Sequence, residues 1–318
     1  MGTWPSEADG QDAADDPEST RLRWTEFLGA VPDPAGSWRL GTRRPLQPPQ
    51  AHGEIQQLHI TSFGTELICE LLLPPDAGAS DILVVVPFYD TASVFGEPTA
   101  RTRLAGRDPA ANAHGLLLAE AGHAVLAVPW WFEHIAARDP GTARATTLDA
   151  RYGPAAAQHR REQSTTALGR SLADLMLTVT ALQDSGLTEG MHLTAFGHSL
   201  GAKLTLHLAA LDPRIRAAAA HEGGLGFAHS NWNAPWYLGD ALPQGRDQDE
   251  LLGLVAPRPF LLAGGGDGDG QHTLELFRAA RRSWPGEKGL DLLLHDGGHP
   301  LPRHVMAGIR EWLDGARA

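Results

Sequence analysis

Short apolar runs alternate with amphipathic stretches along most of this chain. The runs at 82–86 and 259–264 are almost wholly apolar, which is typical of strands buried on both faces of a parallel sheet. Apolar residues elsewhere recur every three or four positions, as on one face of a helix. These patterns predict strands at 54–62, 65–73, 82–86, 123–128, 191–196, 215–220, 259–264 and 289–294, and helices at 19–31, 109–121, 168–182, 202–211, 272–282 and 302–315, with a short helix ending at 251–255. Strands that alternate with helices indicate an α/β fold, with a mostly parallel central sheet and helices on both faces.

Three stretches show neither pattern. Residues 1–18 are acidic and contain Gly and Pro, which predicts a disordered tail. The Pro- and Arg-rich segment 35–52 is expected to be an extended lead-in, and 135–163, with five arginines, a long polar loop. We expect 19–318 to form one domain with insertions near 130–163 and 222–250, since 318 residues suit one large α/β domain.

Composition narrows the classes of partner. The formal net charge of −12 would repel nucleic acid and anionic membrane surfaces, so a small molecule is the expected partner. No run approaches the ~18 apolar residues of a membrane span. The single cysteine, Cys69, cannot form an internal disulfide, and the acidic start lacks the features of a secretion signal, so a cytoplasmic location is expected.

The stretch 193–201 carries the strongest chemical signal. An apolar run ends at Gly197, Ser199 follows at the apex of the predicted turn, and a helical pattern begins directly after Gly201. This is the strand, turn and helix context of a nucleophile elbow, in which glycines allow the strand and the helix to approach each other. Ser199 is therefore a candidate nucleophile.

A base and an acid follow in the chain. His299 stands in a Gly-Gly-His turn after the last predicted strand, where its imidazole is free to reach over the sheet. For the acid that orients it we rank Asp267 first, Asp269 second and Glu222 third, because all three follow strand ends. The order nucleophile, acid, histidine is that of the α/β-hydrolases.

Other residues at the carboxyl ends of strands are candidates for binding. The N–H groups of Leu200 and of Phe88 or Tyr89 are placed to form an oxyanion hole. Trp130 and Trp131 are expected either to wall a pocket or to cover the core. The later loop with Trp232, Trp236 and Tyr237 is expected to line the pocket or to form its lid. Asp267 and Asp269 also allow a hard-cation site, but HExxH and CxxC motifs are absent, so we expect neither a metal nor a cofactor.

Several segments together resemble one branch of the α/β-hydrolase superfamily, that of acetyl xylan esterase-like and glucuronoyl esterase-like proteins. They are Gly197–Lys203, Asp212–Ile215, Glu222, Ser230–Asn231 and Leu254–Pro259. In glucuronoyl esterases the acid is a Glu after the strand that follows the elbow, and a Lys four residues past the Ser contacts the sugar. The resemblance thus implies roles for Glu222 and Lys203, whereas Leu200 stands where those enzymes have an Arg.

We expect a serine hydrolase that cleaves a carboxylic ester with a short acyl group, such as an acetyl or sugar ester. A peptidase or an acyltransferase with the same triad is the alternative, as is a binding protein that keeps the fold without turnover, because one fold hosts many chemistries.

Overall fold

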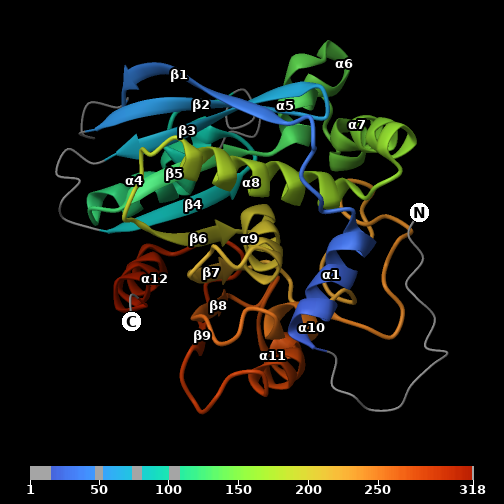
Figure 1. Ribbon diagram of the computed structural model, residues 1–318. Coiled ribbons are helices and arrows are strands. Elements are labelled where there is room, and N and C mark those ends of the chain that lie inside the picture. Colours follow the sequence, from blue (N-terminus) through green and yellow to red (C-terminus); the bar gives the residue numbers. More distant parts are fainter. Residues whose placement is uncertain (1–15, 47–52, 74–80, 100–107, 317–318) are drawn as a thin grey trace.

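A nine-stranded sheet runs through the centre of the computed structural model, which describes residues 16–46, 53–73, 81–99 and 108–316 (Figure 1). Its order is β1-β2-β3-β5-β4-β6-β7-β8-β9. The pairs from β1 to β5 are antiparallel, and all neighbours from β5 to β9 are parallel, which confirms the mostly parallel sheet. The strands are β1 (Ser37–Pro45), β2 (Glu54–Ser62), β3 (Thr65–Leu73), β4 (Ile82–Phe88), β5 (Ala124–Pro129), β6 (His192–His198), β7 (Ala217–His221), β8 (Phe260–Gly264) and β9 (Leu290–Leu294).

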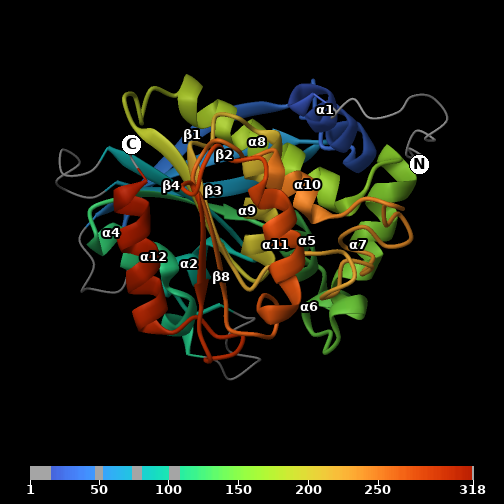
Figure 2. The same cartoon turned by 90° about the horizontal axis from the view of Figure 1, so that it is seen from below.

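Helices cover both faces of the sheet. Figures 1 and 2 show α4 and α12 on one side and α8, α9 and α10 on the other. The helices are α1 (Pro17–Leu28), α2 (Thr91–Val94), α4 (His114–Glu120), α5 (Trp131–Arg138), α6 (Pro140–Ala143), α7 (Leu148–Gln163), α8 (Ala167–Asp184), α9 (Leu200–Leu211), α10 (Gln248–Gly253), α11 (Leu274–Arg281) and α12 (Arg303–Gly315), with 3-10 turns η1 (Pro109–Asn112) and η2 (Gln271–Thr273).

The apolar run of β4 feeds two separate cores. Leu83 and Val85 pack into the core under α8 and α9, whereas Val84 and Val86 pack into the core under α12. Side chains alternate between the faces of a strand, so a strand covered on both faces needs apolar residues at every position. This is why the run in the sequence shows no alternation.

The lead-in predicted at 35–52 is wrong for residues 37–45, which form β1 at the edge of the sheet. Most β1 side chains are exposed, and its arginines pair with polar side chains of neighbouring strands. Arg39 donates to Glu66 and Arg43 donates to Gln56, at 2.9 and 2.8 Å. A strand without a buried apolar face lacks the alternation that would have predicted it. Residues 47–52 lie outside the described part of the chain.

The polar loop predicted at 135–163 is also wrong, since α5, α6 and α7 occupy it. Arg151, one of the five arginines of this predicted loop, is buried and donates to the Glu133 carboxylate from Nε, at 2.8 Å, and from a terminal nitrogen. Tyr152 donates to the same carboxylate at 2.8 Å. Pairing of this kind makes a charged helix face compatible with burial, and it is invisible to residue spacing.

The first helix, predicted at 19–31, begins two residues earlier, at Pro17, and ends at Leu28. Asp16 caps α1, accepting a hydrogen bond from the Ser19 N–H at 3.3 Å, and Pro17 takes the first helical position, where its missing N–H costs nothing. The predicted disordered tail is therefore wrong for residues 17 and 18, and its residues 1–15 lie outside the described part.

Candidate active site

Ser199 lies at a sharp turn between β6 and α9. Its backbone angles are φ 56° and ψ −117°, a strained conformation for a residue with a side chain. A Cβ at Gly197 would overlap the backbone of Gly201, and a Cβ at Gly201 would overlap the carbonyl oxygen of Pro87. Both glycines are thus required by close backbone approach, as the motif predicts, and the Ser199 side chain remains partly exposed.

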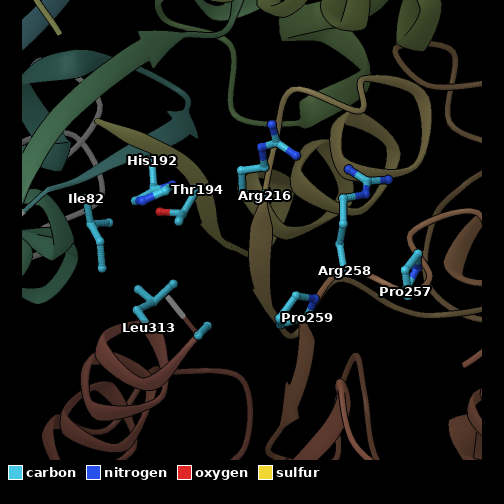
Figure 3. Close-up of a pocket in the computed structure, with 9 residues that line it drawn as sticks. Ile82, His192, Thr194, Arg216, Pro257, Arg258, Pro259 and Leu313 are labelled. Carbon is cyan, nitrogen blue, oxygen red and sulfur yellow. The ribbon is translucent and has the colours of Figure 1, made fainter. Parts of the chain in front are cut away.

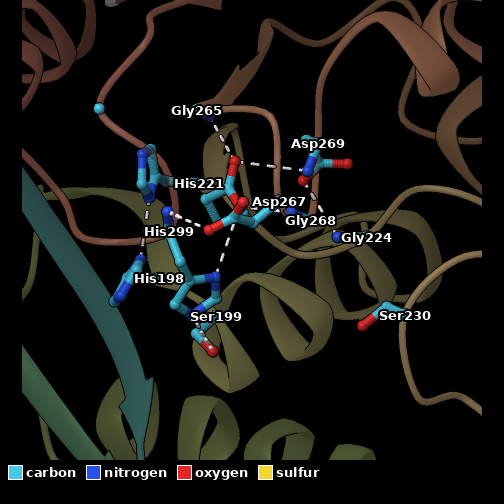
Figure 4. A network of polar contacts seen from close by, with 12 residues as sticks. His198, Ser199, His221, Gly224, Ser230, Gly265, Asp267, Gly268, Asp269 and His299 are labelled. Carbon is cyan, nitrogen blue, oxygen red and sulfur yellow. Dashed lines mark hydrogen bonds and ion pairs between the residues drawn. The ribbon is translucent and has the colours of Figure 1, made fainter.

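His299 reaches this serine from the loop after β9. Its Nε2 lies 3.0 Å from Ser199 Oγ, although the residues are 100 positions apart in the chain (Figure 4). The parallel sheet explains this approach, because the carboxyl ends of β6 and β9 lie at the same edge. The distance suits a proton transfer between the two side chains.

Glu222 stands behind His299. Its Oε2 lies 3.4 Å from His299 Nδ1, and its side chain is fully buried. The residue follows β7 with a φ of 58°. Its carboxylate also accepts hydrogen bonds from the N–H groups of Gly265 and Gly268 and, at 3.4 Å, from that of Asp269.

These donors decide the charge of Glu222. Burial by itself would raise the pKa of the carboxyl group, but the hydrogen bonds from His299 and from the backbone of Gly268, Gly265 and Asp269 outweigh it and lower the pKa to about 2. Glu222 is therefore a carboxylate at neutral pH.

The structure corrects the ranking of the acids. Asp267, ranked first, accepts a hydrogen bond from the backbone N–H of His299 at 2.8 Å, so it holds the loop while Glu222 faces the ring. Asp269 is buried and accepts from the N–H groups of Gly224 and Leu225, at 3.1 and 2.7 Å. Spacing could not rank them, because the Gly-rich loop contributes backbone donors to Glu222 rather than a carboxylate to His299.

The candidate oxyanion donors lie beside Ser199. Leu200 is the first residue of α9, where helix geometry leaves the N–H without an acceptor inside the helix. Phe88 ends β4, and the tight approach of Gly201 to Pro87 brings this strand end against the start of α9. Tyr89 follows, half-buried, with its ring 5.2 Å from that of Phe88. Their role in binding an oxyanion stays a prediction.

The aromatic candidates are buried in the structure. Each exposes at most 7% of its surface: Trp130, Trp131, Trp232, Trp236 and Tyr237. Indole N–H groups of three of the tryptophans donate to other groups of the protein: Trp130 donates to Ser171 Oγ, Trp131 to Thr65 Oγ1 and Trp232 to the Gly224 carbonyl oxygen. For Trp130 and Trp131 the structure favours core cover. Burial of Trp232, Trp236 and Tyr237 speaks against the pocket-lining role expected of them.

Lys203 is buried as well. Its Nζ donates to Ser230 Oγ at 2.9 Å and lies 3.8 Å from the centre of the Trp232 ring. Burial lowers the pKa of the ammonium group to about 7, although the nearby Asp269 favours the charged form. The sugar contact implied by the resemblance would require this side chain to leave its present partners.

A cavity of about 820 Å³ opens beside His299. Its walls include two further histidines, His114 and His198, that the sequence did not single out as site residues. The position of His198 inside the elbow motif, directly before Ser199, was the one signal in the sequence that pointed to it.

Another cavity, of about 350 Å³, lies at the opposite edge of the sheet, around His192, Arg216 and Arg258 (Figure 3). The Arg258 guanidinium is occupied there, since it donates to backbone carbonyls such as those of Ala209 and Ile215. This edge holds the amino ends of the strands, so the cavity is separated from Ser199 by the length of β6.

Within the described ranges no three His, Cys, Asp or Glu side chains are grouped to hold a metal ion, and the Asp269 carboxylate, a candidate cation ligand, accepts backbone N–H donors instead. No helix in the same ranges is long and apolar enough to cross a membrane.

Comparison with known proteins finds similarity in structure alone. No protein-family profile matches the sequence, and no curated protein does. A glucuronoyl esterase from Solibacter usitatus superposes with a TM-score of 0.68 at 16% identity, covering 97% of this chain and 95% of that one. A glucuronoyl esterase from Teredinibacter turnerae gives 0.64 at 17% identity, covering 96% and 87%.

A third similar structure is a putative acetyl xylan esterase from Bacteroides fragilis, with a TM-score of 0.58 at 17% identity, covering 90% of this chain and 76% of that one. These are the kinds of protein that the sequence resembles. The likeness of the structures shows that this chain has the α/β-hydrolase fold.

Proposed function

We propose that this protein is a serine hydrolase that cleaves a carboxylic ester with a short acyl group. The observation that carries the proposal is the continuous series of contacts from Ser199 Oγ to His299 Nε2 and from His299 Nδ1 to Glu222. Several structures that the chain resembles are named esterases, which supports the ester as the substrate.

Ser199 Oγ attacks the ester carbonyl carbon while His299 Nε2 takes the hydroxyl proton. The carbonyl oxygen becomes an oxyanion, which the N–H groups of Leu200 and of Phe88 or Tyr89 bind. His299 then gives its proton to the leaving alcohol oxygen, and the acyl group stays on Ser199. A water molecule, deprotonated by His299, releases the acid and restores Ser199.

Glu222 has two tasks in this cycle. It accepts the Nδ1–H of His299, which leaves Nε2 as the base, and its negative charge stabilises the imidazolium that forms. The low pKa of Glu222 keeps that charge present throughout the neutral range. Asp267 is a positioning residue, because it acts on the His299 backbone.

The test is labelling with a fluorophosphonate probe, read by intact mass, together with hydrolysis of a short-acyl aryl ester. Wild type is expected to gain one adduct and to turn over the ester, and Ser199→Ala is expected to do neither. Ser164→Ala is the matched control, because Ser164 has the same positive φ of 56° at the end of α7. It should keep both properties.

A folded wild type that gains no adduct and hydrolyses no ester would refute the proposal and favour a binding protein of the same fold. An adduct without ester hydrolysis would instead direct attention to amide substrates or acyl transfer.

A further inference from the structure

Three histidines behind the catalytic residues form a hydrogen-bonded chain. His295 Nε2 lies 2.8 Å from His221 Nε2. His221 Nδ1 lies 2.9 Å from His198 Nδ1 (Figure 4). His198 in turn faces His299, with the ring centres 5.0 Å apart. The chain therefore runs from the loop after β9, across the end of β7, to the residue before Ser199.

A backbone N–H group determines which nitrogen donates in each hydrogen bond of this histidine chain. The N–H of Gly297 donates to His295 Nδ1 at 3.0 Å, so Nδ1 is unprotonated and Nε2 carries the hydrogen. His295 then donates to His221 Nε2, which leaves the hydrogen of neutral His221 on Nδ1. His221 donates that hydrogen to His198 Nδ1, and the hydrogen of His198 is consequently on Nε2.

The rings of His221 and His198 are neutral at neutral pH. Burial lowers the pKa of His221 to about 3 and holds that of His198 well below its usual range. A neutral His198 places no positive charge beside His299, where it would oppose formation of the imidazolium. The chain thus presents a donor without a charge.

His198 lines the cavity of about 820 Å³. Its Nδ1 is taken by the hydrogen bond with His221, so Nε2 is the polar atom of the ring that can bind a ligand in this cavity. His114, on the same wall, is 3% exposed, and its buried Nε2 lacks a partner within the described ranges. The wall of this cavity therefore contains two imidazoles.

The cavity lies on the side of His299, the residue that donates a proton to the leaving group. His299 lines it, whereas Ser199 and Leu200 do not. In ester cleavage His299 must protonate the leaving oxygen, so the part of the substrate that lies against His299 is the alcohol. The remaining wall is mixed, with apolar Leu117, Leu301 and Met306 and polar Asn112, Glu120 and Arg303. Its volume is within the range of small-molecule sites.

We infer that this cavity binds the alcohol part of the ester, that this alcohol is hydroxylated and sugar-like, and that His198 donates a hydrogen bond from Nε2 to one of its oxygens. The inference rests on the proposed function. His198 is then a specificity-determining residue, and His221 and His295 position its hydrogen.

The test compares two acetyl esters that share a six-membered ring framework, methyl 6-O-acetyl-glucopyranoside and cyclohexylmethyl acetate. Both carry the acetyl group on a CH₂ attached to a six-membered ring, and only the first has hydroxyl groups. His198→Phe is expected to lower the ratio of kcat/KM between the glucoside and the cyclohexyl ester about tenfold, the worth of one hydrogen bond, chiefly through KM for the glucoside. His198→Gln, which keeps a donor near the place of Nε2, should recover most of the ratio.

His192→Phe is the matched control, because His192 starts the same strand at the opposite edge of the sheet. It should leave the ratio unchanged. A ratio that is also unchanged in folded His198→Phe overturns the inference, while hydrolysis of both esters by wild type keeps the proposed function intact.

A second measurement needs no variant. Nitrogen-15 NMR of histidine-labelled wild type is expected to show His198 protonated on Nε2, with a shift of that signal when methyl glucopyranoside is added. Protonation on Nδ1, or no response to the sugar, overturns the inference. This readout decides the matter even if wild type hydrolyses neither ester, an outcome that counts against the proposed function.

Discussion

Replacing Glu222 with Gln is the sharpest test of the assignment of the acid. Four N–H groups converge on the carboxylate: those of Gly265, Gly268 and Asp269 from the backbone, and Nδ1–H of His299. Oε1 faces Gly265 and Asp269, and Oε2 faces both Gly268 and His299. Glutamine has one acceptor oxygen, so in either orientation its NH₂ group meets at least one of these donors.

Two effects follow from that geometry. A buried donor left without an acceptor costs about 1–3 kcal/mol of the free energy of unfolding. Loss of the negative charge also removes the partner of the imidazolium and favours the wrong imidazole tautomer, which in a Ser-His-acid triad costs about 10⁴-fold in kcat. We therefore expect a folded but less stable protein with kcat reduced by roughly 10³–10⁴-fold.

Asp267→Asn is the matched control, because it makes the same change in the neighbouring carboxylate. The Asn oxygen can still accept the His299 backbone N–H, so kcat should fall less than about tenfold. Steady-state hydrolysis of an acetyl aryl ester gives kcat, and urea unfolding gives the stability. Our assignment of the acid is wrong if Asp267→Asn loses as much activity as Glu222→Gln, or if Glu222→Gln keeps a tenth or more of the wild-type kcat.

The dependence of stability on acidic pH is an independent test of the hydrogen bonds to Glu222. The pKa of Glu222 is lowered from 4.5 to about 2, so its carboxylate stabilises the folded state above pH 4.5, and this contribution is lost as the pH falls toward 2. The difference in free energy of unfolding between wild type and Glu222→Gln should therefore narrow over that interval. A constant difference would contradict the assigned hydrogen bonds.

Two further substitutions test the elbow and its buried lysine. Gly201→Ala should destabilise the protein by about 1–3 kcal/mol in urea unfolding, because the new methyl group overlaps the Pro87 carbonyl oxygen. The control Gly153→Ala, in an open position of α7, should leave the stability unchanged or raise it. Equal effects of the two substitutions would refute the packing argument. The free energy of unfolding of wild type should rise from pH 7 to pH 10, because Lys203 releases its proton near pH 7 in the folded protein but only near 10.5 in the unfolded chain. Lys203→Met should flatten this rise, whereas the control Lys288→Met should not. Parallel curves for wild type and Lys203→Met would exclude a lowered pKa of Lys203.

Residue patterns alone predicted most elements that are covered on one or both faces. The buried strands β4 and β8 and the long helix α8 carry strong apolar periodicity, and each was expected within a few residues of its observed bounds. The strand β1 and the helices α5–α7 were missed, because an exposed edge strand and a helix stabilised by a buried Arg151–Glu133 pair have no such periodicity.

The elbow around Ser199 could also be derived from the sequence, since its requirements are local. Strand, turn and helix are consecutive in the chain. The two glycines are required by close contacts with backbone atoms a few residues away or in the adjacent strand. His299 could be placed as well, because a residue after the last parallel strand must lie at the carboxyl edge of the sheet.

What the sequence determined, then, is the alternation of elements, the parallel sheet, the elbow with Ser199 and the position of His299. Only the tertiary structure decided which carboxylate faces the imidazole, that the Gly-rich loop supplies N–H donors to Glu222, and that His198, His221 and His295 form a chain. These outcomes depend on side-chain directions and backbone hydrogen bonds between segments tens of residues apart. Spacing along the chain carries no information on such contacts, because they are set by the packing of strands and loops against one another.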